Sequence, residues 1–336
     1  MNHRTPIQHY YVLFLFLWLC CQDASAQNAN AYSSIRHCNR GELSYPFCDE
    51  DRDLVADVAE PGLDPKTLVV GFVAMEERDT YEMYNPLINQ LSKCTGKKVE
   101  IYPAMDEYSV IIGMKNANIH IALIPTGLMS MVVNIAGALP FASQGVSSER
   151  AAKQTRMLLL VRKDSPYKSL KDLLNKQIAH VSHTSNTGDT VPRAIFTSLE
   201  FKPDIDYVVR YSGRHDRSIL GVLYGFYDAA AVSGAIFEQM ALRGEIAPDL
   251  FRTIYTSKNF PVASFTYSSQ LNYKLSQKIS SCFFNYHFPE EMVSWLGGSD
   301  RFYPINYKKD WNTVRRFNVM AGKHFGNAQL EQLRDE

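Results

Sequence analysis

The stretch HTSNTGDTVPRAIF, residues 183–196, places small polar side chains directly ahead of an apolar helical pattern. Ser185 and Thr187 supply hydroxyl donors, and Asn186 supplies an amide. The first turn of a helix adds unpaired N–H groups and the positive end of its dipole, which suit an anion. Gly188 allows a ligand or another backbone to approach closely. Taken alone, the stretch also predicts an ordinary N-cap, because Ser, Thr and Asn are favoured there.

Two further strand-to-helix junctions have the same design. In SGRHDRSIL a Ser-Gly pair ends a predicted strand and His215 begins a helix, where an imidazole can donate to an oxyanion and titrate near neutrality. The alternative is a surface histidine beside a capping Asp216. In IPTGLM, Thr126 and Gly127 lie at the tip of the junction. Three such junctions in one chain predict a shared anion site.

An acidic run, DEDRDLVADVAE, has the residue types of a cation site. Asp49, Asp51 and Asp53, followed by Asp57 and Glu60, fall at positions 1, 3, 5, 9 and 12 of a calcium-loop spacing. The sixth position holds a leucine where such loops need glycine, and no flanking helices are evident. The run therefore predicts either a Ca²⁺ site or a solvated acidic loop.

Motifs of enzymatic chemistry are missing. The sequence has no G-x-S-x-G, H-E-x-x-H, Walker lysine loop or G-x-G-x-x-G. His183 lies near Ser182 and Ser185, but neighbours in sequence rarely form a nucleophile and its base, since geometry defines that pair. We expect a binding protein that needs no cofactor, not an enzyme.

The elements that must position these junctions alternate along the chain. Strand patterns at 67–75, 99–104 and 119–127 alternate with helical patterns, and a second alternating block begins at 156. This order predicts parallel βαβ units and an α/β fold in two lobes. A loop is expected over 258–265. Ligands of open α/β sheets bind beyond the carboxyl ends of strands, where the polar junctions fall.

The composition restricts the class of partner and the compartment. The chain has 336 residues, with 35 Lys+Arg and 35 Asp+Glu, so net charge gives no reason to expect nucleic acid or an anionic membrane surface. Residues 1–26 have the basic start, apolar run and Ala-Ser-Ala end of a cleavable signal peptide, which predicts an exported, periplasmic product. A lipoprotein is the alternative, but Cys20 follows Leu19 instead of a small residue.

Four cysteines remain after that cleavage. Cys38 and Cys48 close a short loop within a polar extension, residues 27–65, and are the natural disulfide pair in an oxidising compartment. Cys94 and Cys282 either pair through the fold or stay as buried thiols.

From residue 67 to about 316 the chain resembles the periplasmic phosphate/phosphite/phosphonate-binding proteins of ABC importers. VRKDSPYKSLKDL is similar to the entry into the family's second lobe, and FYPINYKKDW to its closing segment. SNTGDTVPRA resembles the family's S-T-S-G-x-x-x-P loop, with Asn186 and Thr187 in place of Thr and Ser. His215 matches the family's histidine, and EYSVIIGM resembles its tyrosine-bearing loop.

The resemblance implies a type II periplasmic binding fold with a ligand cleft between two lobes and two crossover hinge segments. Lobe 1 would comprise 66–155 plus 259–336, and lobe 2 would comprise 156–258. Tyr108, Thr126 and Gly127 would contribute to the ligand site from the first lobe. Ser185, Asn186, Thr187, Gly188 and His215 would contribute from the second.

The resemblance also implies the ligand and the partners. The acid that relatives use for aminoalkyl ligands is absent from Pro261–Ser264, so an ammonium group would lack its partner there. A small oxyanion such as phosphite, phosphate or methylphosphonate therefore fits better. Arsenite would need a cysteine ligand, and the candidate loops contain none. We expect a monomer that serves a membrane permease; the alternative is a sensor that presents the oxyanion to a histidine kinase.

Overall fold

The computed structural model describes residues 38–59, 61–72, 81–103, 106–323 and 325–335. The predicted signal peptide, residues 27–37 of the extension and Glu60 lie outside these ranges. Within them, each helix is too short or too polar to cross a membrane.

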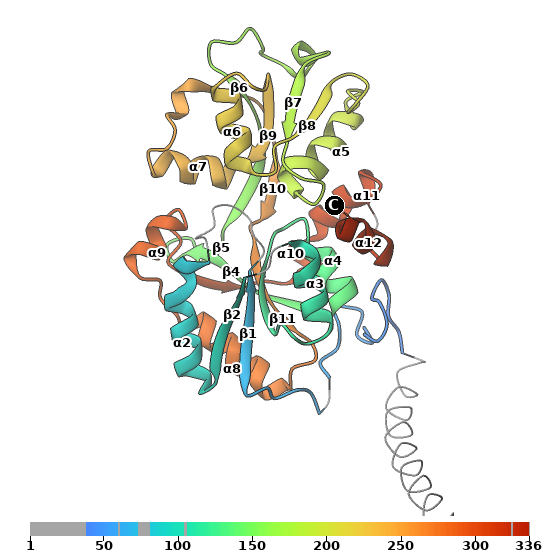
Figure 1. Cartoon of the computed structure of the whole chain (residues 1–336), viewed down its shortest axis with the longest axis vertical. Helices are drawn as coiled ribbons and strands as arrows, with labels where there is room; N and C mark the ends of the chain where they lie inside the picture. Colours follow the sequence, from blue (N-terminus) through green and yellow to red (C-terminus); the bar gives the residue numbers. More distant parts are fainter. Residues whose placement is uncertain (1–37, 60, 73–80, 104–105, 324, 336) are drawn as a thin grey trace, which may run out of the picture.

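The first lobe is built on a seven-stranded sheet in the order β12-β4-β11-β3-β1-β2, with β5 beside β4 (Figure 1). Strands β2, β1 and β3 are parallel, and the other pairings are antiparallel. The strands are β1 (Thr67–Phe72), β2 (Lys98–Pro103), β3 (Ile121–Ile124), β4 (Ala138–Val146), β5 (Ala151–Ala152), β11 (Ser264–Ser268) and β12 (Arg301–Pro304). The helices of this part are η2 (Glu82–Tyr84), α2 (Asn85–Thr95), α3 (Glu107–Lys115), α4 (Met129–Ala136), α8 (Tyr273–Phe284) and α9 (Glu290–Trp295).

The second lobe is built on a five-stranded sheet in the order β10-β6-β9-β7-β8. Its strands are β6 (Gln154–Arg162), β7 (Gln177–His180), β8 (Val208–Tyr211), β9 (Ala229–Ser233) and β10 (Phe251–Pro261). Its helices are η3 (Leu170–Leu173), η4 (Asn186–Thr190), α5 (Val191–Ser198), α6 (His215–Leu223), α7 (Gly234–Leu242) and η5 (Pro248–Leu250).

Apolar runs become the central strands because both faces of each sheet are covered. Every residue of β3 (IALI) and of β9 (AAAVS) is buried. Strands buried on both faces lose the alternation of polar and apolar residues, and β-branched and small apolar side chains take over.

The chain crosses between the lobes twice. Between β5 and β6 the connection is Lys153, and between β10 and β11 it is Val262–Ala263. The predicted loop over 258–265 is confined to Val262–Ala263. Residues 258–261 continue β10 and pair with the start of β6, and residues 264–265 begin β11. Strand β10 is an edge strand, where the missing N–H of Pro261 costs no ladder hydrogen bond.

The C-terminal segment packs beside both lobes (Figure 1). It comprises α10 (Tyr307–Asp310), α11 (Asn312–Met320) and α12 (Asn327–Asp335). Helix α11 contacts α5 and η4 of the second lobe, and α12 contacts α3 of the first. The ring of Phe317 on α11 meets that of Phe260 at 5.6 Å between centroids, next to the second crossing.

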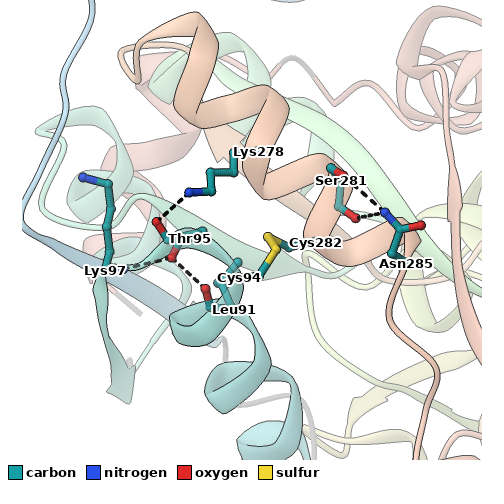
Figure 2. Close-up of a disulfide and its surroundings, with 8 residues drawn as sticks. All are labelled: Leu91, Cys94, Thr95, Lys97, Lys278, Ser281, Cys282 and Asn285. Carbon is teal, nitrogen blue, oxygen red and sulfur yellow. Dashed lines mark hydrogen bonds between the residues drawn. A yellow bond between two sulfur atoms is a disulfide. The ribbon is translucent and has the colours of Figure 1, made fainter.

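Both cysteine pairs form disulfides. The Cys38–Cys48 bridge confirms the predicted pair. The Cys94–Cys282 bridge resolves the open alternative and joins α2 to α8 through two cysteines that lie 188 residues apart in the chain (Figure 2). Beside it, Lys278 Nζ donates to the carbonyl of Thr95 at 3.0 Å, so a hydrogen bond joins the same two helices.

Candidate functional site

A cavity of about 340 Å³ lies between the two sheets and is lined from both lobes. Six of the eight predicted site residues line it. They are Thr126, Gly127, Ser185, Asn186, Thr187 and His215.

The turn that follows β7 carries three of these residues. Ser185 caps it, with its Oγ accepting from the N–H of Gly188 at 3.0 Å. The turn is π-helical and therefore wider than an α-helical turn, because Thr190 N–H donates to the carbonyl of Ser185, five residues back. Such π-helical turns occur frequently at functional sites. The turn exposes Asn186 and Thr187 to the cavity although each is about 5% exposed or less.

Asn186 is the most informative side chain of the site. It is 4% exposed, and neither its amide nitrogen nor its amide oxygen has a hydrogen-bond partner. A buried amide without partners is destabilising by roughly 1–3 kcal/mol. Since Asn186 lines the cavity, a ligand there can supply the missing partner.

His215 is oriented by the start of the neighbouring helix α7. Its Nδ1 accepts from the backbone N–H of Ser233 at 3.1 Å. The other nitrogen, Nε2, therefore carries the hydrogen of the neutral ring and lies 3.5 Å from Ser185 Oγ. Burial lowers the pKa of His215 to about 4. The predicted titration near neutrality is therefore wrong for this ring, which stays a neutral donor at pH 7.

The β3–α4 junction contributes from the first lobe. Thr126 lines the cavity, but its hydroxyl donates to the carbonyl of Pro261 at 2.7 Å, and its own carbonyl accepts from Trp311 Nε1 at 3.2 Å. Both contacts attach the junction to other parts of the chain, so the Thr126 hydroxyl holds the second crossing in place. Gly127 lies directly against residues 184–186 of the second lobe.

Two predicted residues lie off the cavity. Tyr108 is half-buried against the core, and its neighbour Glu107 lines the cavity instead. Consecutive residues of a helix point about 100° apart, and on α3 it is Glu107 that is directed at the cavity while Tyr108 packs against the core. Gly188 packs against Val181, whose Cβ would lie 2.5 Å from an added side chain. Its role in this structure is to leave room behind the turn.

Further residues of the cavity were missed from the sequence. Thr155 Oγ1 and Ser233 Oγ lie 3.0 Å apart, and Thr155 Oγ1 accepts from the N–H of Ala235 at the start of α7. The Ser-Gly pair between β9 and α7 repeats the pattern of the other junctions and was the available signal. The remaining wall is largely apolar, with Tyr84, Leu123, Val262, Ile236 and Trp295 among its members.

Three carboxylates also line the cavity, and each has a partner. Glu107 accepts from the Thr184 hydroxyl at 2.7 Å, while Asp216 pairs with Arg214 and Glu245 with Arg243. The prediction that an ammonium group would lack an acidic partner was based on Pro261–Ser264 alone. These three carboxylates lie elsewhere in the cavity wall.

A buried ionic network supports the turn from behind. Asp189 is 1% exposed, and its carboxylate accepts hydrogen bonds from three side chains: His180 Nδ1 at 2.9 Å, Arg193 Nε at 2.8 Å and Lys323 Nζ at 2.9 Å. Burial alone would raise the pKa of Asp189, but the His180 hydrogen bond and the charges of Lys323 and Arg193 hold it far below its usual value. Lys323 also bonds Thr190 Oγ1 at 2.8 Å, so the network ties the C-terminal segment to the turn.

Two α/β lobes are joined by two crossings, and the cavity between them combines neutral donors and helix starts with an apolar wall and three partnered carboxylates. This arrangement defines a solute-binding protein. A family model described as "ABC transporter, phosphonate, periplasmic substrate-binding protein" matches residues 70–311. The chain belongs to this family, whose members are solute-binding proteins and not enzymes, and which need no cofactor.

Known proteins agree with that assignment. The chain is similar to the phosphate-import protein PhnD of Mycolicibacterium smegmatis, with 26% identity over 230 residues, which is 65% of this chain and 71% of the relative. It is also similar to PhnD1 from Prochlorococcus marinus in complex with methylphosphonate, with a TM-score of 0.65, 15% identity, and coverage of 77% of this chain and 100% of that one. A binding protein component of an ABC phosphonate transporter from Pseudomonas aeruginosa gives a TM-score of 0.66 at 20% identity, covering 81% and 95%. At these identities the two structures bear on the fold, and they confirm the type II periplasmic binding fold.

Proposed function

We propose that this chain binds a small phosphorus oxyanion (phosphite, phosphate or a small alkylphosphonate) between its lobes and delivers it, as a periplasmic monomer, to an ABC permease. The predicted lobes, 66–155 plus 259–336 and 156–258, would close on the ligand about the two crossings. The family assignment favours a permease over a sensor kinase as partner. Export would use the predicted signal peptide, residues 1–26.

The unpaired amide of Asn186 carries this proposal. A phosphonate oxygen can accept from its Nδ2, from the hydroxyls of Ser185 and Thr187 and from Nε2–H of His215, all of which line one cavity. Neutral donors and helix N-termini suit an anion that must enter and leave, because they stabilise its charge without a fixed ion pair. The apolar remainder of the wall favours a ligand with a P–C bond, such as methylphosphonate.

Calorimetric titration of two asparagine variants tests the proposal. Asn186→Ala should weaken methylphosphonate binding by about 10- to 100-fold, since one hydrogen bond to a charged group is worth about 1.5–3 kcal/mol. Asn318→Ala is the matched control, because Asn318 is also a buried amide without partners but does not line the cavity. The control should bind as the wild type does.

The comparison of the two variants decides between outcomes. Wild-type affinity in Asn186→Ala, or equal losses in both variants, would contradict the proposed site. Failure of methylphosphonate, phosphite and phosphate to raise the melting temperature of the wild type would contradict the ligand class. A parallel titration with 2-aminoethylphosphonate shows whether the paired carboxylates of the wall accept an ammonium group.

A further inference from the structure

The acidic loop that follows Cys48 gathers three carboxylates. One oxygen from each of Asp49, Asp51 and Asp53 lies within 4.8 Å of the other two. Carboxylates at that spacing repel one another, and among the described residues no lysine or arginine forms an ion pair with any of the three. The loop therefore concentrates negative charge that no ion pair among the described residues balances.

Asp49 is the buried member of this carboxylate cluster. It is 2% exposed, and its Oδ1 is buried with no hydrogen-bond partner. Burying a carboxylate without a partner is strongly unfavourable, so such groups are normally paired or bound to a metal ion. Asp49 belongs to the cluster, and its buried, unpartnered Oδ1 is an independent observation that favours a bound cation there.

The backbone at the sixth position of the spacing has the conformation that glycine provides in calcium loops. Leu54 stands at the sixth position of the spacing, where calcium loops use glycine for a sharp turn. Here it adopts φ +73°, the left-handed conformation that glycine would give. The N–H of Asp53 donates to Asp51 Oδ1 at 3.1 Å and that of Val55 to Asp53 Oδ1 at 3.0 Å, which curl the loop around the carboxylates. Leu54 thus supplies the turn for which such loops normally need glycine.

We propose that Asp49, Asp51 and Asp53 bind a Ca²⁺ ion. Ca²⁺ takes six to eight oxygen ligands in flexible geometry, which suits a cluster of carboxylates in an irregular loop. Asp57, at the ninth position, faces the same loop, where its Oδ2 accepts from the N–H of Glu50 at 3.1 Å. None of these residues lines the ligand cavity, so the ion is a structural one.

The ion would fasten the N-terminal extension to the first lobe. The Asp57 N–H bonds the carbonyl of Cys48 at 2.8 Å, and Lys308 Nζ of α10 bonds the carbonyl of Arg52 at 2.9 Å. Further along, Ala59 N–H bonds the carbonyl of Ser269 at 2.8 Å. Calcium binding would therefore stabilise the folded mature protein without changing its ligand.

Calcium titration of the chelator-stripped mature protein, with both disulfides intact, tests the site. CaCl₂ should bind with a Kd on the order of 10⁻⁴–10⁻³ M, as in extracellular modules, and should raise the melting temperature progressively. Asp51→Asn combined with Asp53→Asn should weaken calcium binding at least tenfold and remove the shift, while methylphosphonate affinity stays unchanged. Glu50→Gln, an exposed acid of the same loop outside the cluster, should bind calcium like the wild type.

Two outcomes would overturn the proposal. One is a wild-type protein that shows neither a saturable heat nor a rise in melting temperature up to 10 mM CaCl₂. The other is a double variant that keeps wild-type calcium affinity. Neither depends on the phosphonate titration, so the calcium site and the oxyanion site can fail separately.

Discussion

Gly127 and Thr184 bring the two lobes into contact beside the cavity. A β-carbon on residue 127 would lie 2.0 Å from the carbonyl oxygen of Thr184 and 2.7 Å from the backbone nitrogen of Asn186. Both obstacles are backbone atoms, which cannot move aside as the end of a side chain can. The glycine is therefore required for space: the first lobe reaches the ligand turn of the second only without a side chain here.

Gly127→Ala should prevent this approach of the lobes. We expect methylphosphonate affinity to fall at least tenfold, and the scattering radius of the protein with saturating ligand to exceed that of the wild type. Gly326→Ala is the control, because a β-carbon there would meet no atom within 4 Å. Wild-type affinity in Gly127→Ala would show that binding does not use this contact.

His215 should make the ligand-free protein lose stability in acid. Its pKa is about 4 when folded, against about 6.5 in the unfolded chain, so between these values the unfolded state binds more protons. The free energy of unfolding falls as the pH drops from about 6.5 to 4, by at most roughly 3 kcal/mol from this residue. His215→Asn, whose amide oxygen can still accept from Ser233 N–H, should lack that part of the loss.

Urea denaturation of wild type and His215→Asn at pH 7 and pH 4.5 measures the difference. Contributions of the other titrating groups cancel in the comparison of the two proteins. Parallel pH dependence in both would show that His215 does not carry a lowered pKa.

Among the polar residues of the buried network that supports the turn, Asp189 should cause the largest loss of folding stability when it is replaced. Asp189→Asn leaves Arg193 and Lys323 without their buried counter-charge, which typically costs about 3–5 kcal/mol. Lys323→Gln should cost less, because the lysine side chain is 20% exposed, and should loosen the C-terminal segment from the turn. Lys258→Gln, at an exposed position, should stay within about 0.5 kcal/mol of the wild type.

Denaturation midpoints, with hydrogen exchange of 312–323, check these values. An Asp189→Asn variant as stable as the wild type would contradict the view that this network supports the turn.

The two disulfides should differ in their contribution to stability. The cysteines of the Cys94–Cys282 bridge are 188 residues apart in the sequence, and those of the Cys38–Cys48 bridge are 10 residues apart. Loop entropy of the unfolded chain then assigns about 5 kcal/mol to the first and about 3 kcal/mol to the second. The variant Cys94→Ser with Cys282→Ser should unfold at clearly lower denaturant than Cys38→Ser with Cys48→Ser. The reverse order would show that strain or residual structure outweighs loop entropy.

Much of the architecture was readable from local pattern. Alternating strand and helix signals predicted the α/β fold, and the polar strand-to-helix junctions at Thr126, Ser185 and His215 do border one cavity. The match is physical: parallel strands direct their carboxyl ends to one edge, so loops that follow them gather there whatever the details of packing. The missed junction at Ser233 has the same local signature.

Other features depend on residues that are distant in the chain. The family resemblance predicted Tyr108 at the ligand, but Glu107 lines the cavity instead, because tertiary packing decides which face of α3 meets it. The pairing of Cys94 with Cys282 needs α2 and α8 side by side. The continuation of β10 through Pro261 needs β6 as its partner.

By itself, the sequence determined the class of fold, the positions of the polar junctions and the acidic loop spacing, because these follow from residue type and short-range periodicity. Only the tertiary structure decided that His215 is a neutral donor, that Asn186 is buried without partners, and that Gly127 must lack a side chain. Burial, pKa and steric room are set by atoms that folding brings together from far along the chain, and no local pattern records them.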